Sequence, residues 1–234
     1  MDRSLKIKAM ANKSSEAPIV DVEEVYSKGE QYIEKNKKSL SIIAGVVIAF
    51  IGLYFGYEFL VLQPQSEEAR QEMWKAQHYF EVDSFNLALN GDGQFLGFLD
   101  LADEYSSVEE GNLCNYYIGI CYLRQGMFED AIDYLKEFDS SDEVVGPMAT
   151  GCIGDAYLEL GDTDNALSYY EQAANQRNNE FTTPMFLKKA GDLYAFLGDN
   201  AKAIKAYERI KYDYPGSEQA RTIDKFLSRA ELAQ

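Results

Sequence analysis

The longest apolar stretch of the chain runs from Leu40 to Leu62 and separates a short charged segment from a long segment with helical periodicity. From Ser39 to Tyr57 no residue is charged. A helix that rises about 1.5 Å per residue needs roughly 20 residues to cross a hydrocarbon layer about 30 Å thick. Apolar helices in soluble cores usually end after about 10 to 14 residues. The pattern therefore predicts a transmembrane helix over residues 39–62.

The charged residues on either side of this stretch predict its orientation. Lysines precede it and glutamates follow it: Lys35, Lys37, Lys38 before, and Glu58, Glu67, Glu68 after. Positively charged flanks stay in the cytoplasm. A cleaved signal would have an apolar region of about 7 to 15 residues followed by a small-x-small site, which is not the pattern here. We therefore expect a retained signal anchor with a cytoplasmic N-terminus and the C-terminal domain across the membrane.

The segment before the anchor predicts a cytoplasmic tail over residues 1–38. Met1 to Pro18 has no apolar period and is typical of a flexible tail, and either Met1 or Met10 could be the start. From Asp21 apolar residues recur at three- and four-residue steps, and Asp21 with Glu24 resembles a capping box. This pattern predicts a short amphipathic helix that lies on the membrane surface or against a partner.

Small residues form one stripe of the predicted anchor. They are Gly45, Ala49, Gly52 and Gly56, at steps of four, three and four. In lipid, small residues let helices approach closely, and Gly52 with Gly56 makes a GxxxG pair. The stripe predicts a packing face for a partner helix, although glycine is also frequent in membrane helices in general.

After the anchor, the pattern predicts a helical hairpin over residues 66–106. Gln63, Pro64 and Gln65 are expected to end the membrane helix, and Ser66 to cap the next. Met73, Trp74, Ala76, Gln77 and Phe80 form an apolar stripe of a helix that reaches about Ala88. Asn90 to Gly93 predicts a turn, and Gln94 to Tyr105 a second helix.

Three later segments repeat one pattern, G-x-x-Y-x-x-x-G-x-x-x-x-A, from Gly119, Gly154 and Gly191. This period of 35 and 37 residues predicts three helix pairs over residues 112–215. The first glycine and the alanine (Ala131, Ala166, Ala203) are expected where the two helices meet, with Tyr122, Tyr157 and Tyr194 between helices. Gly126, Gly161 and Gly198 are expected to end the first helices in a left-handed conformation, followed by Asp162 and Asp199 as turn or N-cap residues. Ser217 is expected to start a capping helix over residues 217–234.

This pattern resembles the tetratricopeptide repeat, which implies an all-α solenoid. The hairpin over residues 66–106 lacks the glycine and tyrosine and is similar to a degenerate first repeat. The whole layout resembles the YfgM-like ancillary subunits of the bacterial SecYEG translocon. That resemblance implies a bacterial inner-membrane protein with a periplasmic repeat domain. Its implied partners are the Sec translocon, a periplasmic chaperone and secreted polypeptides.

By resemblance to the repeat family, successive first helices line a groove that holds a peptide or a partner helix. The groove positions are Leu113, Tyr116, Ile120, Arg124, Met148, Asp155, Glu159, Met185, Lys188, Asp192 and Phe196. Tyr116, Met148, Met185 and Phe196 would form an adaptable apolar strip for unfolded segments.

The charge and the residue composition argue against a nucleic-acid partner and against a metal or catalytic site. Residues 63–234 hold 14 Lys/Arg against 31 Asp/Glu, which disfavours nucleic acid as a partner. Cys114, Cys121 and Cys152 have no zinc spacing and are expected as small core residues, with a disulfide to Cys152 still possible. His78 is the only histidine and is expected to pack rather than bind a metal. No catalytic, cofactor or metal motif is found.

The sequence thus predicts a membrane-anchored protein-interaction module beside the Sec translocon and not an enzyme, with no cofactor and no small-molecule substrate. The alternatives are a structural scaffold for an envelope assembly, or a cytosol-facing receptor if the topology is inverted.

Overall fold

A computed structural model describes residues 22–233 of the chain, and side-chain surroundings from Glu30 onward. Every regular element in that range is helical, and no strand occurs between residues 22 and 233. The predicted tail from Met1 to Pro18 and the predicted cap at Asp21 lie outside the described residues. The all-α prediction is confirmed.

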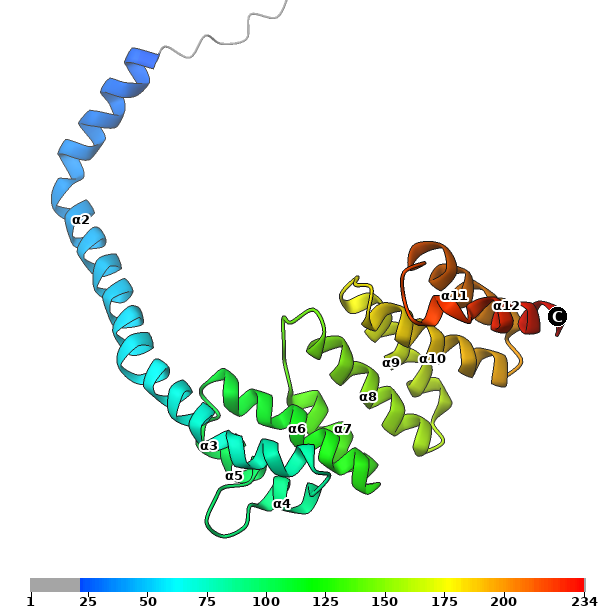
Figure 1. The fold of residues 1–234 in the computed structure, drawn as a ribbon. Helices are drawn as coiled ribbons and strands as arrows, with labels where there is room; N and C mark the ends of the chain where they lie inside the picture. Colours follow the sequence, from blue (N-terminus) through cyan, green and yellow to red (C-terminus); the bar gives the residue numbers. More distant parts are fainter. Residues whose placement is uncertain (1–21, 234) are drawn as a thin grey trace, which may run out of the picture. The chain divides into compact units, whose positions relative to one another are not determined.

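The chain divides into two compact units, Met1–Glu58 and Phe59–Gln234. In the first unit, α2 (Val22–Tyr57) is one uninterrupted helix, so the predicted amphipathic and apolar helices are not separate elements (Figure 1). The apolar window is long enough to cross a membrane, and none of it is buried. Large side chains such as Ile48, Phe50 and Leu53 are exposed along it. This lack of burial distinguishes α2 from the core helix of a water-soluble protein.

The prediction that Gln63 to Gln65 end this helix is wrong. A π-helical turn, η1 (Glu58–Leu62), leads directly into α3 (Gln63–Glu81). Pro64 lies in the first turn of α3, where its fixed φ angle and missing N–H are tolerated. Ser66 therefore lies inside the helix rather than at a cap, and its hydroxyl donates to Glu110 Oε1 over 2.9 Å.

The first hairpin is more divided than predicted. The helix expected to reach Ala88 ends at Glu81, Asp83 has a left-handed φ of 57°, and a short α4 (Phe85–Asn90) follows. The predicted helix from Gln94 starts later, as α5 (Phe98–Glu104). The reason is local, because Asp92 Oδ1 accepts the backbone N–H groups of Gln94 and Phe95 at 2.9 and 2.8 Å. These bonds hold a turn instead of a helical start.

Three helix pairs follow and stack in sequence order (Figure 1). They are α6 (Glu109–Gln125) with α7 (Phe128–Glu137), α8 (Val145–Glu159) with α9 (Thr163–Gln176), and α10 (Thr182–Phe196) with α11 (Asn200–Asp213). A 3₁₀ turn, η2 (Gln219–Arg221), and α12 (Ile223–Leu232) close the stack. Ser217 caps the 3₁₀ turn by accepting the N–H of Ala220, so the final α-helix begins later than predicted.

The predicted turns between paired helices are confirmed. Gly126, Gly161 and Gly198 have φ angles of 78°, 79° and 82°, a region that glycine enters without strain. Asp162 and Asp199 then accept the backbone N–H groups of Asn165 and Lys202 as N-caps of α9 and α11.

The predicted close approach at the first glycine of each repeat is also confirmed. A Cβ atom added to Gly119 would lie 2.5 Å from Leu135 Cγ. A Cβ atom added to Gly154 would lie 2.8 Å from the Tyr170 ring, and a Cβ atom added to Gly191 would lie 2.6 Å from the Tyr207 ring. The glycine thus makes room for a large side chain from the second helix.

The three cysteines are free and buried. Burial raises the thiol pKa of Cys114, Cys121 and Cys152 to about 12, so they stay protonated at neutral pH. They are small core residues, as predicted, and the disulfide left open for Cys152 is not formed.

Candidate partner-binding groove

The predicted groove residues lie on the first helices of the three repeats, α6, α8 and α10, and differ widely in exposure. Arg124, Glu159, Asp192 and Phe196 are exposed, whereas the others are partly buried: Leu113, Tyr116, Ile120, Met148, Asp155, Met185 and Lys188. Within the predicted apolar strip, Phe196 is 82% exposed, but Met148 and Met185 pack against the hydrophobic core. A partner therefore meets one prominent aromatic ring rather than a continuous apolar strip.

Tyr116 is engaged with the core. Its ring centroid lies 5.5 Å from Phe138 and 5.8 Å from Tyr117. Burial raises the pKa of Tyr116 to about 12. Changing this residue would disturb packing, so Tyr116 is a poor probe of the groove.

Asp155 connects two repeats. Its carboxylate accepts the Tyr170 hydroxyl at 2.7 Å, and Lys189 Nζ from α10 lies 2.6 and 2.7 Å from its two oxygens. Burial raises the pKa of Tyr170, and Asp155 raises it further. Most of the hydrogen-bonding capacity of Asp155 is thus used inside the domain.

Asp192 holds the equivalent position one repeat later. It accepts the Tyr207 hydroxyl at 2.9 Å and pairs with Lys188 at 2.7 Å. Lys188 Nζ also lies 3.8 Å from the centroid of the Phe226 ring in α12, a cation–π contact. These contacts connect the last repeat to the capping helix.

A pocket of about 340 Å³ lies where α10 and α11 meet α12. Asp192 and Phe196 line it together with Phe226 and Arg229. It joins an exposed aromatic ring, an apolar wall and both signs of charge, which suits a short peptide segment. Phe226 and Arg229 were not among the predicted groove residues, although they are three apart and so share a face of the final helix.

A second hollow of about 660 Å³ lies between the start of α6 and the loop from Phe138 to Val145. Of the predicted groove residues, Leu113 lines this hollow. Its lining includes Glu109, Asp139 and Asp142. The hollow is acidic, and the predicted groove residues of α8 and α10 do not reach it. The structure therefore does not join all eleven predicted positions into one cavity.

Hydrogen bonds from one repeat to the next fix the stack. Lys136 Nζ of α7 donates to the Tyr157 hydroxyl of α8 over 3.1 Å. One repeat later, the Tyr194 hydroxyl of α10 donates to Glu171 Oε1 of α9 over 2.6 Å. Lys136 and Glu171 each lie five residues after the alanine of their repeat. Two of the three tyrosines predicted to fill gaps between helices, Tyr157 and Tyr194, thus also bond to the preceding repeat.

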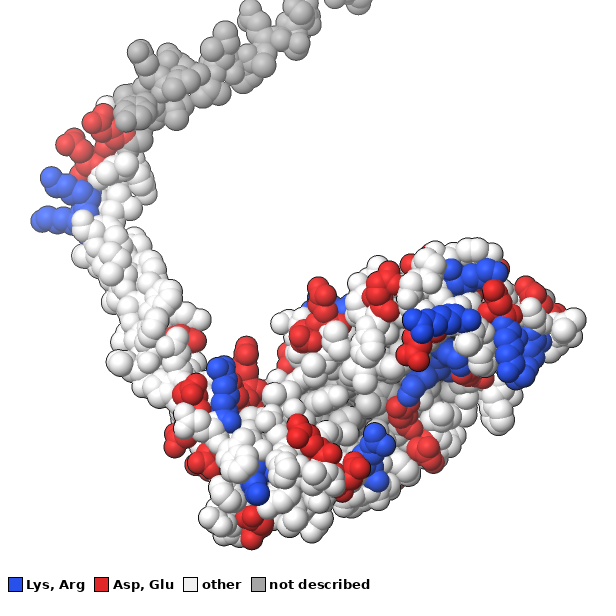
Figure 2. Space-filling view, in the orientation of Figure 1, with Lys and Arg blue, Asp and Glu red and all other residues white. Residues whose placement is uncertain are grey.

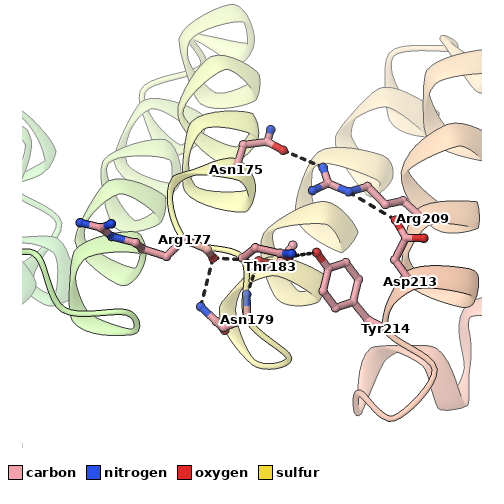
Figure 3. Close-up of polar contacts among 8 residues, drawn as sticks. Asn175, Arg177, Asn179, Thr183, Arg209, Asp213 and Tyr214 are labelled. Carbon is pink, nitrogen blue, oxygen red and sulfur yellow. Dashed lines mark hydrogen bonds and ion pairs between the residues drawn. The ribbon is translucent and has the colours of Figure 1, made fainter. Parts of the chain in front are cut away.

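The loop between α9 and α10 adds polar contacts (Figure 3). Asn179 Oδ1 accepts the N–H of Thr182 at 2.7 Å, and Thr183 Oγ1 donates to the Arg177 carbonyl at 3.1 Å. The Tyr214 hydroxyl donates to Asn178 Oδ1. These bonds fix the start of α10, which carries the last groove positions.

The predicted packing face of α2 is open. A Cβ atom added to Gly45, Gly52 or Gly56 meets no atom within 4 Å, and Ala49 is exposed. Its role as a helix-packing face remains a prediction.

His78, predicted to pack, is instead exposed on α3, with its ring centroid 6.3 Å from that of Tyr79. Residues 22–233 contain no group of three or more His, Cys, Asp or Glu side chains that could hold a metal ion.

Comparison with known proteins agrees with the repeat geometry. Two tetratricopeptide repeat family models match the chain, one at residues 114–140 and one at residues 153–218. No curated protein matches it. The matched residues cover the second helices, the glycine turns and the Tyr–Asp contacts described above. The chain therefore contains tetratricopeptide repeats over residues 114–140 and 153–218, and these repeats indicate a protein–protein interaction module.

Proposed function

We propose that this chain is a single-pass protein of a bacterial inner membrane that accompanies the Sec translocon and links it to periplasmic chaperones for secreted proteins. The observation that carries the proposal is the joining of an apolar, unburied helix to a tetratricopeptide repeat unit. The flanking charges favour a cytoplasmic N-terminus and a periplasmic repeat domain.

The pocket between α10 and α12 supports a role in holding a partner segment. Phe196 offers apolar surface, while Lys188 and Asp192 are partly satisfied by each other and leave a polar border. An extended segment could place one apolar side chain against Phe196 and Phe226.

The first experiment is co-purification from a mild detergent followed by mass spectrometry of the bound proteins. The wild type is compared with the double variant Gly52→Ile and Gly56→Ile, and with Val47→Phe as a control that adds bulk on the opposite face of α2. Recovery of translocon subunits or a membrane chaperone, lost only in the glycine variant, supports the proposal. Recovery of envelope-assembly components without translocon would replace it with a scaffold function.

Topology is tested separately by adding protease to spheroplasts. Digestion of the repeat domain from outside agrees with the proposed orientation. Protection of that domain would contradict it and favour a cytosol-facing receptor.

The groove is tested with Phe196→Ser, because this side chain is 82% exposed and its loss leaves the core intact. We expect weaker partner recovery with unchanged helicity in circular dichroism. Unchanged recovery would show that the partner binds elsewhere.

A further inference from the structure

Charge is distributed unevenly within the second unit. Residues 63–181 hold 5 Lys/Arg against 24 Asp/Glu, whereas residues 182–234 hold 9 against 7. Figure 2 shows Lys and Arg side chains gathered over the C-terminal helices, while Asp and Glu predominate elsewhere on the second unit. The last repeat and the capping helix are therefore a basic region on an otherwise acidic domain.

Three of these cations line one pocket. Lys202, Lys205 and Arg209 follow each other at steps of three and four on α11, which places them on one face of that helix. The pocket has a volume of about 320 Å³ and lies between α9, α10 and α11. Leu187 and Ala190 supply apolar surface within it. It is distinct from the pocket that contains Phe196.

Two of the three cations are held in place by neighbouring residues. Arg209 Nη1 donates to Asn175 Oδ1 over 2.7 Å, and Arg209 Nε lies 3.9 Å from Asp213 Oδ2 (Figure 3). Lys202 Nζ lies 3.3 Å from Asp199 Oδ2 and 4.9 Å from the Tyr194 ring centroid. These contacts orient the positive charge around the pocket.

Lys205 is different, because it is exposed and makes no ion pair or side-chain hydrogen bond with any residue in the described range 22–233. Glu171 is the one carboxylate that lines the pocket, and its Oε1 already accepts the Tyr194 hydroxyl at 2.6 Å. Burial and this hydrogen bond raise the pKa of Tyr194, so the hydroxyl remains a donor at neutral pH. The lining of the pocket thus holds three cations against one carboxylate, and the ammonium group of Lys205 has no ion-pair partner among the described residues.

We propose that this pocket binds an acidic side chain from a Glu- or Asp-rich segment of a partner polypeptide. Charge complementarity identifies the occupant, because three cations on one face of α11 line a recess in a domain that is otherwise acidic. A carboxylate can reach Lys205 and Arg209 together, while the aliphatic part of its chain contacts Leu187. The site goes beyond the proposed groove function, because the groove is assigned to first helices whereas all three cations stand on a second helix.

A bilayer surface fits the pocket less well. Attraction to anionic lipid needs cations that project freely over an extended surface. Arg209 is instead partly buried and bound to Asn175, and Glu171 stands within the recess. The geometry favours a single side chain entering from a polypeptide.

The test uses the full-length protein in a non-ionic detergent and a fluorescent peptide of six glutamates flanked by alanines. Anisotropy measures its binding to the wild type, to Lys205→Glu and to Lys225→Glu. Lys225 is also an exposed lysine of the basic region but lies outside the pocket, so both variants change net charge equally. We expect binding about tenfold weaker or more for Lys205→Glu and nearly unchanged for Lys225→Glu.

The proposal would be overturned if the peptide did not bind the wild type, or if both variants weakened binding equally. Displacement of the peptide by inorganic phosphate at equal charge concentration would also overturn it. So would Lys205-dependent binding to phosphatidylglycerol vesicles without binding to the peptide. Circular dichroism checks the fold, and Lys205→Gln serves as a milder variant that should weaken binding in the same direction. Because partner recovery through Phe196 is measured separately, failure here leaves the proposed function unaffected.

Discussion

Among the three repeats that begin with glycine, the first (α6 and α7) and the two that follow share one backbone arrangement but pack it with different chemistry. In the first, Gly119 makes room for Leu135, and the residue after the glycine is Ile120. In the second and third, the glycine makes room for a tyrosine, and the residue after it is an aspartate that accepts the tyrosine hydroxyl. The glycine is thus required by geometry in all three repeats.

The polar pair is a consequence of using tyrosine. Tyr170 and Tyr207 are each 2% exposed, and a buried hydroxyl without a partner is costly. Asp155 and Asp192 supply that partner from the neighbouring helix. Two positions that family resemblance assigns to partner binding therefore also serve the interior, which the apolar first repeat does not need.

High pH should destabilise all three repeats through their buried tyrosines, and most strongly the two repeats in which a carboxylate accepts the tyrosine hydroxyl. Burial raises the pKa of Tyr116 from its ordinary value of 10.0 to about 12, and the pKa values of Tyr170 and Tyr207 are raised as well. The unfolded chain loses these protons first, so the stability that the buried tyrosines contribute is complete below about pH 10 and falls as pH rises toward 12. For Tyr116 the loss is up to about 3 kcal/mol.

Urea unfolding followed by circular dichroism between pH 8 and 12 measures this loss. The double variant Tyr170→Phe and Tyr207→Phe should show a shallower decline with pH. Equal slopes in variant and wild type would show that the second and third repeats do not titrate as described.

A methyl group at the glycine should be costly in every repeat. Gly191→Ala places a Cβ 2.6 Å from a Tyr207 ring atom, and we expect a loss of about 1 to 3 kcal/mol in the free energy of unfolding. Gly119→Ala should cost less, because Leu135 can change rotamer whereas the Tyr207 ring is held through Asp192.

Gly216→Ala is the matched control, since its Cβ would meet only Glu180 Oε2, at 3.9 Å. Urea denaturation of the three variants makes the comparison. Equal costs for Gly119 and Gly191 would contradict the role given to the hydroxyl bond.

Removing the Tyr207 hydroxyl alone should lower the free energy of unfolding less than adding a methyl group at Gly191. Tyr207→Phe is expected to cost about 1 kcal/mol in unfolding free energy, because it removes one hydrogen bond to a carboxylate that is partly exposed. Tyr212→Phe is the control, because Tyr212 is 67% exposed. If both changes had the same effect in urea denaturation, the buried bond would contribute nothing.

The smallest expected change in stability concerns the N-cap of α7, the second helix of the repeat that contains Gly119. Met127 has nearly the same backbone angles as Asp162 and Asp199, but it cannot accept a hydrogen bond from the start of α7. Met127→Asn should raise stability by about 0.5 to 1 kcal/mol, and asparagine avoids adding charge beside Glu129 and Asp130. A thermal melt that shows no increase would mean that this cap does not limit the first repeat.

The repeats could be predicted from the sequence because their glycines and alanines are required by close helix contact. The first hairpin could not, because its breaks depend on Asp83 and on the turn held by the Asp92 side chain. Continuity through Pro64 was also missed, since proline is compatible with the first turn of a helix as well as with a break.

The candidate site was predicted only in part. Phe196 is exposed as expected, but the inward bonds of Asp155 and Asp192 follow from tyrosines 15 residues later on another helix. Arg229 enters the pocket because α12 folds back on the last repeat. Spacing along a single helix does not reveal such contacts.

The hydrogen bonds at the two junctions between repeats run in opposite directions. At the first junction a lysine donates to a tyrosine oxygen, and at the second a tyrosine donates to a glutamate oxygen. Because a tyrosine hydroxyl can both accept and donate a hydrogen bond, the same residue type joins the repeats at both junctions while the residue that faces it changes from a cation to an anion.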